Sequence, residues 1–372
     1  MKKIAFFLPS MRGGGAERVM ATLAREFANL GHDVDMILAS AEGPYLSELG
    51  EGVRVISLNK KCVSYSLIDL VKYLKKEKPD VLLSSLNNAN IVSIVAKKIA
   101  NTKTRVIIRQ ANTLSLNQLN ISGKIRVRDR VLPSLVRYIY PYADVVVAVS
   151  NGVKSDLIEY AGIDKNKIVV IYNPVIDSKI YERALEDIDH PWLQDRSSPV
   201  ILSVGRLNRQ KDYETLIRAV EIVAKHMSIR LIILGEGGER RSLEKMVADK
   251  QMSEYVSMPG FVDNPFPFIK QADVFVLSSI FEGLPNVLIQ SLALGTPVIS
   301  TDCPYGPREI LEDGLSGRLV PVQNPSMLAS SLLNYFAKSE DILGATSVSL
   351  SRFCVATCVK KYFNLIEFLK NE

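Results

Sequence analysis

Short apolar runs rich in β-branched residues alternate with helix-like segments along most of this chain. A buried strand followed by an amphipathic helix is typical of a parallel βαβ unit. The alternation runs from residue 4 to residue 171, stops over residues 176–198, and resumes from residue 200 to residue 336. At 372 residues, the chain is also too long for one typical domain. We therefore predict an α/β protein of two Rossmann-like, doubly wound domains joined by a linker at 176–198.

The domain boundaries follow from this pattern, with the first domain at 1–178, the second at 179–355, and a C-terminal helix at 356–372 that can pack back toward the first. The expected strands are 4–8, 33–39, 53–58, 81–84, 105–109, 145–149, 168–171, 200–204, 230–234, 256–258, 274–277, 298–300 and 318–320. The expected helices are 16–30, 67–77, 89–100, 122–140, 152–160, 213–225, 240–249, 286–294, 326–336 and 356–369. Because ligands of open α/β sheets bind at the carboxyl ends of the strands, two such domains facing each other form a binding cleft.

Charge is shared unevenly between the two halves of the chain. Residues 1–178 hold 25 Lys and Arg against 16 Asp and Glu, whereas residues 179–372 hold 21 against 24. A basic half predicts an anionic partner, and a membrane surface, a phosphorylated lipid and a nucleic acid are the candidates. No nucleic-acid-binding motif occurs, so nucleic acid is disfavoured.

The start of the chain and its cysteines indicate the cellular compartment in which the protein is expected to work. The apolar run at 4–8 is shorter than the core of a signal peptide, and no run approaches the length of a membrane span. The cysteines lie scattered, without the spacing of a disulfide framework or a metal site: Cys62, Cys303, Cys354 and Cys358. We expect a cytoplasmic protein that binds no metal, with peripheral attachment to a membrane left open.

A glycine-rich segment, residues 11–18, directly follows the first predicted strand and opens the first helix. Its glycines let the backbone approach a phosphate at a helix N-terminus, and a plain tight turn is an equal alternative. The spacing is not that of the dinucleotide fingerprint, and the second strand ends without an acidic ribose ligand. An NAD-dependent dehydrogenase is therefore disfavoured.

In the second domain, three loops follow predicted strands. Residues 205–211 carry Arg206 and Lys211, which together suit a departing diphosphate. Residues 280–290 place Glu282 before a helix that Pro285 starts, so Gly283 and Leu284 are expected to point backbone N–H groups at an anion. Residues 302–309 form a further Gly/Pro loop on the same rim.

These four segments, in this order, resemble the retaining family 4 glycosyltransferases of the GT-B fold, and most of all the bacterial members that extend lipid-linked oligosaccharides. The resemblance implies that Arg206 and Lys211 bind the donor diphosphate and that Glu282 contacts the sugar; these three are the expected catalytic residues. It further implies a reaction with a nucleotide diphosphate sugar, UDP being the leading choice, and no other cofactor. Because no cluster of Asp, His or Cys residues has the spacing of a metal site, we expect the reaction to be metal-independent. The remaining donor-binding positions that it implies are Gly14, Gly15, Phe261, Val262, Asn264, Gly283, Leu284, Pro285, Asn286, Val287, Gln290 and Gly306.

The chain departs from the family pattern at two points. Gln290 stands where the second motif glutamate would hold the ribose; an amide can still bind both hydroxyls, with less strength than a carboxylate. Many relatives have a histidine within the segment that corresponds to 109–113, and this chain has none there. Acceptor binding is then expected to rest on Arg109 and Asn112.

A basic and apolar stretch, residues 122–140, is a second candidate acceptor surface. Arg126 and Arg130 in it would contact a polyprenyl diphosphate or an anionic bilayer, and a solvated helix face is an equal alternative. The resemblance implies transfer of a hexose or N-acetylhexosamine to a lipid-linked glycan in polysaccharide, O-antigen or glycoprotein-glycan assembly. A nucleotide-sugar 2-epimerase of the same architecture and a non-catalytic nucleotide-sugar-binding protein are the competing hypotheses.

Overall fold

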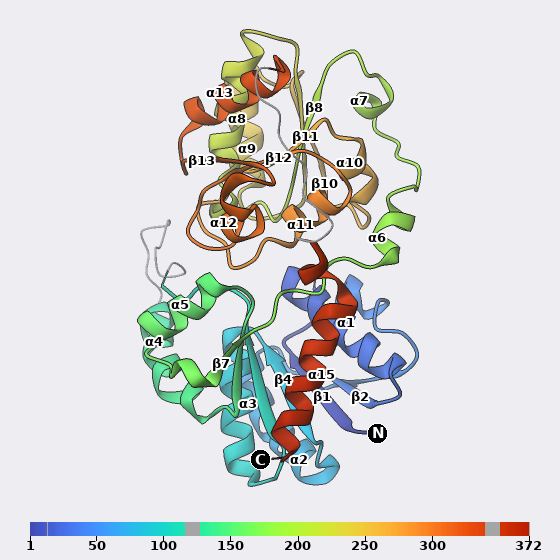
Figure 1. The fold of residues 1–372 in the computed structure, drawn as a ribbon, viewed down its shortest axis with the longest axis vertical. Coiled ribbons are helices and arrows are strands. Elements are labelled where there is room, and N and C mark those ends of the chain that lie inside the picture. The colour runs from blue at the N-terminus through green and yellow to red at the C-terminus, as the bar shows by residue number, and fades with distance from the viewer. Residues whose placement is uncertain (13, 116–126, 339–349, 372) are drawn as a thin grey trace. The chain divides into compact units, whose positions relative to one another are not determined.

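A computed structural model describes residues 1–12, 14–115, 127–338 and 350–371 and divides the chain into two compact units, Met1–Pro174 with Val355–Glu372, and Val175–Cys354 (Figure 1). We call these unit 1 and unit 2. Each unit contains one parallel sheet, and helices alternate with the strands along the chain, as the sequence predicts.

Unit 1 is built on a seven-stranded parallel sheet of order β3-β2-β1-β4-β5-β6-β7. Its strands are β1 (Lys3–Leu8), β2 (Asp33–Leu38), β3 (Val53–Ser57), β4 (Val81–Ser85), β5 (Arg105–Gln110), β6 (Val145–Ala148) and β7 (Ile168–Val170). Its helices are α1 (Gly15–Asn29), α2 (Leu67–Glu77), α3 (Asn87–Ala100), α4 (Val127–Ile139), α5 (Asn151–Glu159) and α15 (Val355–Asn371). The strand order reverses between β1 and β4, which makes their carboxyl ends the place where a doubly wound sheet binds ligands.

The C-terminal helix α15 completes the core of unit 1 (Figure 1). Cys358, Tyr362 and Ile366 are buried in one apolar cluster with residues of α1 and β1, such as Phe27 and Phe6. Burying an apolar side chain of this size contributes about 1.5–3 kcal/mol, so the helix is an integral part of the unit.

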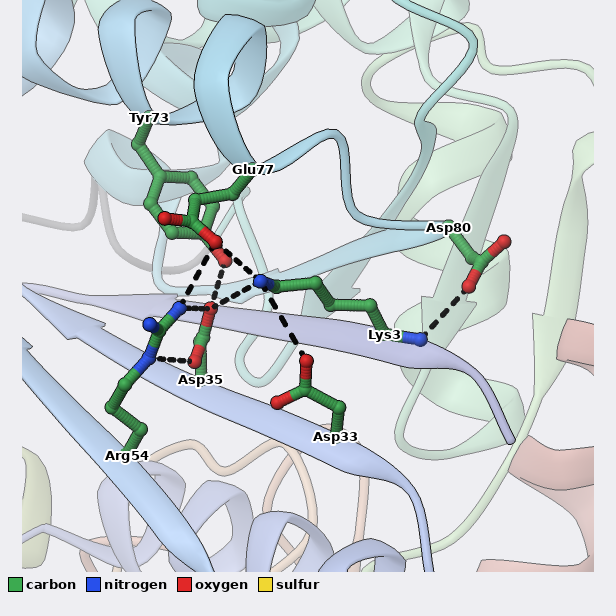
Figure 2. A network of polar contacts seen from close by, with 7 residues as sticks. All are labelled: Lys3, Asp33, Asp35, Arg54, Tyr73, Glu77 and Asp80. Carbon is green, nitrogen blue, oxygen red and sulfur yellow. Dashed lines mark hydrogen bonds and ion pairs between the residues drawn. The ribbon is translucent and has the colours of Figure 1, made fainter.

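A charged network ties the amino ends of β1, β2 and β3 to the end of α2 (Figure 2). The fully buried Asp35 accepts two hydrogen bonds of 2.7 Å from Arg54 and one from the Tyr73 hydroxyl. Lys3 pairs with Glu77 and lies 3.8 Å from Asp35. Burial, and then the bond to Asp35, raise the pKa of Tyr73. The network lies at the edge opposite the carboxyl ends of the strands, which indicates a structural role.

Unit 2 is built on a six-stranded parallel sheet of order β10-β9-β8-β11-β12-β13. Its strands are β8 (Val200–Val204), β9 (Arg230–Leu234), β10 (Val256–Gly260), β11 (Val274–Leu277), β12 (Val298–Thr301) and β13 (Arg318–Val320). Its helices are α6 (Ser178–Arg183), α7 (Pro191–Gln194), α8 (Tyr213–Ala224), α9 (Arg240–Asp249), α10 (Phe266–Gln271), α11 (Asn286–Ala293), α12 (Pro307–Ile310) and α13 (Pro325–Phe336). Here the strand order reverses between β8 and β11.

The structure corrects three details of the predicted elements. The segment 176–198, expected to be a linker without regular structure, contains α6 and α7, which Asp177 and His190 cap through side-chain hydrogen bonds. The short helix α12 begins within the predicted loop 302–309, and α10 was not predicted. The basic helix is described over Val127–Ile139 as α4, and the rest of its predicted start, 122–126, lies outside the described residues.

Candidate functional site

The loops after β8 and β11 meet at the point where the strand order of unit 2 reverses. The two strands pair directly, with Ile201 opposite Val274 and Leu202 opposite Phe275, although they are far apart in sequence. The loop after β8 holds Arg206 and Lys211, and the loop after β11 holds Glu282. Carboxyl ends at such a reversal are where open α/β sheets bind nucleotides.

Glycines let the backbones of the loops after β8 and β9 come close together here. A Cβ on Gly235 would lie 2.0 Å from the carbonyl oxygen of Gly205, and its φ of +141° also favours glycine. A Cβ on Gly205 would lie 2.9 Å from the Lys211 side chain. The side chain of Lys211 thus runs directly over the Gly205 backbone, which fixes its course toward the β11 loop.

Lys211 and Glu282 form a buried ion pair. The Lys211 Nζ lies 2.7 Å from Glu282 Oε1, and the two side chains are 16% and 9% exposed. The Ser279 hydroxyl donates to the same oxygen at 2.7 Å. A cation and a carboxylate with little water around them interact more strongly than a surface pair does. The expected diphosphate-binding cation and the expected sugar-binding carboxylate are therefore brought together.

Other expected donor residues of unit 2 lie on the same loops as this pair, on α11 or on the loop after β12. Arg206 is exposed next to Gly205, and the half-buried Gln290 lies on α11, whose N-cap is Pro285 rather than the first helical residue. Gly306 has φ +88°, and a Cβ there would lie 2.8 Å from Pro285 and 3.0 Å from the Gly283 carbonyl oxygen. The loop 302–309 therefore packs on the start of α11 and fixes its position.

Cys303, in the loop 302–309 that the sequence places on the same rim, lies beside the ion pair. Its thiol is buried, and burial, with the nearby Glu282 charge as a smaller cause, raises its pKa. The thiol is therefore neutral at physiological pH and behaves as a small apolar group.

The loop after β10 holds Phe261, Val262 and Asn264, which are among the expected donor-binding positions; by the family resemblance they would receive the nucleotide base, largely through backbone groups. Phe261 is 54% exposed and Val262 is half-buried. The Asn264 amide donates to the Arg183 carbonyl oxygen at 2.8 Å and to Glu186 at 2.7 Å, so it anchors the end of α6. Any contact of Asn264 with a base would have to use its backbone.

In unit 1, the described part of the glycine-rich loop lies at the N-terminus of α1, after the carboxyl end of β1. Gly14 is the N-cap in an extended conformation and is not capped by a side chain. A Cβ there would lie 2.4 Å from the Glu17 carboxylate, at the far end of a flexible side chain that can move aside. Gly15 is exposed at the first helical position, whereas Gly13 lies outside the described residues.

The expected acceptor residues have different environments. Arg109 is 1% exposed; it donates to Ser85 at 3.1 Å and to Asn173, and burial lowers its pKa. It joins the end of β4 to the chain after β7, so a role in acceptor binding, which remains a prediction, would act through these neighbours. Asn112 is half-buried and accepts a bond from its neighbour's backbone N–H. Arg126 lies outside the described residues, and Arg130 is on α4.

Sequence reasoning did not identify Ser279 and Gln210, which both contact Glu282. Their residue types are common in loops, and only the pairing of β8 with β11 brings them to the carboxylate. Within the described parts of the chain, no three His, Cys, Asp or Glu side chains gather as metal ligands, and no helix is long and apolar enough to cross a membrane. Metal independence remains a prediction.

Family models match both units. The model described as Glycosyltransferase Family 4 matches residues 13–179, and the model described as Glycosyl transferases group 1 matches residues 198–338. Among curated proteins, the chain is 33% identical to an N-acetylgalactosamine-N,N'-diacetylbacillosaminyl-diphospho-undecaprenol 4-alpha-N-acetylgalactosaminyltransferase of Campylobacter jejuni, over 89% of each chain. It is 27% identical, over 100% of each chain, to a second alpha-1,4-N-acetyl-D-galactosaminyltransferase of the same organism, named for an undecaprenol-linked diphosphate substrate.

Solved structures support the fold. HepE from Anabaena, in complex with UDP and glucose, matches with a TM-score of 0.81 at 20% identity, over 99% of this chain and 100% of that one. A sucrose-phosphate synthase from Thermosynechococcus elongatus matches with a TM-score of 0.82 at 19% identity, over 100% of each chain. The architecture is that of the GT-B class, as predicted, and the matches give no support to the epimerase hypothesis. The chain belongs to family 4 of the glycosyltransferases.

Proposed function

We propose that this glycosyltransferase moves a hexose or N-acetylhexosamine from a UDP-sugar to a hydroxyl of a polyprenyl-diphosphate-linked glycan, with retention of configuration and without a metal ion. The observation that carries the donor half of this proposal is the ion pair of Lys211 and Glu282 at the strand-order reversal of unit 2, beside Arg206. It puts a cation for a diphosphate next to a carboxylate for a neutral sugar.

The reaction depends chiefly on stabilisation of the departing diphosphate. When the bond from sugar C1 to the phosphate oxygen breaks, negative charge grows on the diphosphate and positive charge grows on the sugar. Arg206 and Lys211 supply positive charge to the leaving group, and Glu282 accepts hydrogen bonds from the sugar. In this proposal the departing phosphate takes the proton of the acceptor hydroxyl on the same face, so no separate base is needed.

Support for the acceptor comes from the relatives and from charge. The two Campylobacter jejuni relatives are named for undecaprenol-linked diphosphate substrates. Residues 1–178 carry the excess of basic side chains, which favours a phosphorylated lipid or an anionic membrane surface. We infer that the chain works at the cytoplasmic face of the membrane as a peripheral protein.

A donor screen tests the proposal. Purified protein is incubated in EDTA with UDP-, GDP- and ADP-sugars and a bacterial membrane extract, and sugar incorporation into lipid is followed beside a Glu282→Ala variant. Incorporation from one UDP-sugar, lost in the variant, is the expected result. Binding of a donor without transfer would instead favour the non-catalytic hypothesis, and incorporation that requires added Mg²⁺ would contradict metal independence.

A further inference from the structure

We propose that Ser279 and Gln210 are positioning residues that hold the Glu282 carboxylate in place while Lys211 turns from it to the donor diphosphate. The proposal rests on the proposed function and adds to it a pair of supporting residues and an exchange of partners at Lys211.

The two oxygens of Glu282 have unequal surroundings. Oε1 accepts from Lys211 Nζ and from Ser279 Oγ, both at 2.7 Å. Among the described residues, Oε2 has only a long contact of 3.5 Å, with the Gln210 Nε2 amide. A carboxylate has about four lone-pair sites, so Oε2 retains capacity to accept from a sugar hydroxyl.

Donor binding is expected to draw the Lys211 ammonium group from Glu282 to the diphosphate. Its ammonium group is the only cation bonded to Glu282 among the described residues. A diphosphate carries more negative charge than a carboxylate and attracts the ammonium more strongly. Without other support, the Glu282 side chain would then lose the bond that orients it at the moment when the sugar arrives.

Ser279 and Gln210 remain fixed during such an exchange because other bonds hold them. The side-chain amide of Gln210 donates to the Phe281 carbonyl oxygen at 2.9 Å, and the backbone carbonyl oxygen of Gln210 accepts from the Ile280 backbone N–H at 2.8 Å. The Ser279 carbonyl oxygen accepts from the Thr301 hydroxyl at 2.6 Å. The Gln210 bonds join the β8 loop to the β11 loop, and the Thr301 bond joins the β11 loop to β12. None of them depends on the Lys211 side chain, so the carboxylate keeps its orientation with Oε2 facing the donor sugar.

Kinetics with the Ser279→Ala variant test this role. The rate of sugar transfer should fall, because the loss of a hydrogen bond to a charged group lowers kcat by about tenfold or more. Affinity for UDP alone, which lacks the transferred sugar, should stay within about twofold of the wild-type value, since Arg206 and Lys211 are intact. The preference for the best UDP-sugar over its C4 epimer, measured as a ratio of kcat/KM, should shrink.

Two further variants keep the test decisive. Gln210→Met removes the amide at a half-buried position and should give the same split between kcat and UDP affinity, even if Ser279→Ala folds poorly. Thr296→Val is the matched control: its buried hydroxyl donates to a backbone carbonyl oxygen at 2.6 Å, at the amino end of β12. This control should keep wild-type kcat and sugar preference.

Three results would overturn the proposal: wild-type kcat and sugar preference in both Ser279→Ala and Gln210→Met, a parallel loss of UDP affinity and kcat, or an equal loss of kcat in Thr296→Val. Failure of the proposed function looks different, because the wild-type protein would then transfer no sugar or Glu282→Ala would be as active as wild type.

Discussion

Replacing Lys211 by methionine removes the cation of the buried ion pair while keeping most of the apolar stem. The Glu282 carboxylate, 9% exposed, then keeps one hydrogen bond of 2.7 Å, from Ser279, and the long Gln210 contact. Breaking a buried ion pair from one side costs about 3–5 kcal/mol. Because Lys211 is 16% exposed and Ser279 remains, we expect Lys211→Met to lower the free energy of unfolding of unit 2 by about 2–3 kcal/mol.

The second half of this prediction is a double-mutant cycle. The substitution Lys211→Met leaves the Glu282 carboxylate without its cation, and Glu282→Gln removes this unpaired negative charge. The double variant Lys211→Met/Glu282→Gln should therefore be more stable than Lys211→Met alone. The coupling energy between the two positions should be about 1–2 kcal/mol, as for side chains in direct contact.

Trp192, the only tryptophan of the chain, lies in unit 2 and reports its unfolding in urea by fluorescence. Lys245→Met is the control, because Lys245 pairs with Asp249 on the surface of α9, with both side chains more than 60% exposed. It should cost less than about 0.5 kcal/mol. A Lys211→Met variant that loses no more than this control, with no coupling to Glu282, would refute the buried-pair reasoning.

Three further predictions concern unit 2. Gly306→Ala and Gly314→Ala both place alanine at a positive φ, and each should lower the free energy of unfolding by about 1–2 kcal/mol. Only Gly306→Ala, whose Cβ meets Pro285 and Gly283, should also lower the rate of sugar transfer. Equal transfer rates in the two variants would contradict this. Gln290→Glu should tighten UDP binding about threefold to tenfold in a calorimetric titration, since a carboxylate binds ribose hydroxyls more strongly than an amide does; unchanged or weaker binding would count against a ribose site at this position. His190 is buried, and burial lowers its pKa in the folded state, so the wild-type protein should lose stability as the pH falls below the unfolded-state pKa of about 6.5. In urea unfolding, His190→Asn should lose less stability than the wild type between pH 7.5 and pH 5. Equal losses in the two proteins would contradict this direction of the pH dependence.

Much of the fold could be predicted because strands and helices have clear periods in the sequence. Strand β8 and helix α9 begin and end at the predicted residues. The short helices α6 and α7 were missed, because a helix of four to six residues shows little periodicity and depends on its caps, here Asp177 and His190.

The candidate site could be predicted only as far as residue type and loop position allow. Lys211 and Glu282 were expected because each follows a strand, and the structure adds that they bond to each other. Ser279 was not expected, since its role depends on which strands pair. Arg109 illustrates the converse. Its place in the segment where many relatives have a histidine suggested an acceptor contact, but its burial among Ser85 and Asn173 is a property of the packed sheet that no local pattern shows.

The central claim is that unit 2 binds the donor diphosphate through Arg206 and Lys211 without a metal ion. Calorimetric titration of UDP into the wild-type protein in EDTA, beside Arg206→Ala and the exposed control Arg241→Ala, tests it most directly. The account predicts binding in EDTA that Arg206→Ala weakens by about tenfold or more and Arg241→Ala leaves unchanged. Binding that requires Mg²⁺, or that is equally strong in Arg206→Ala, would contradict it.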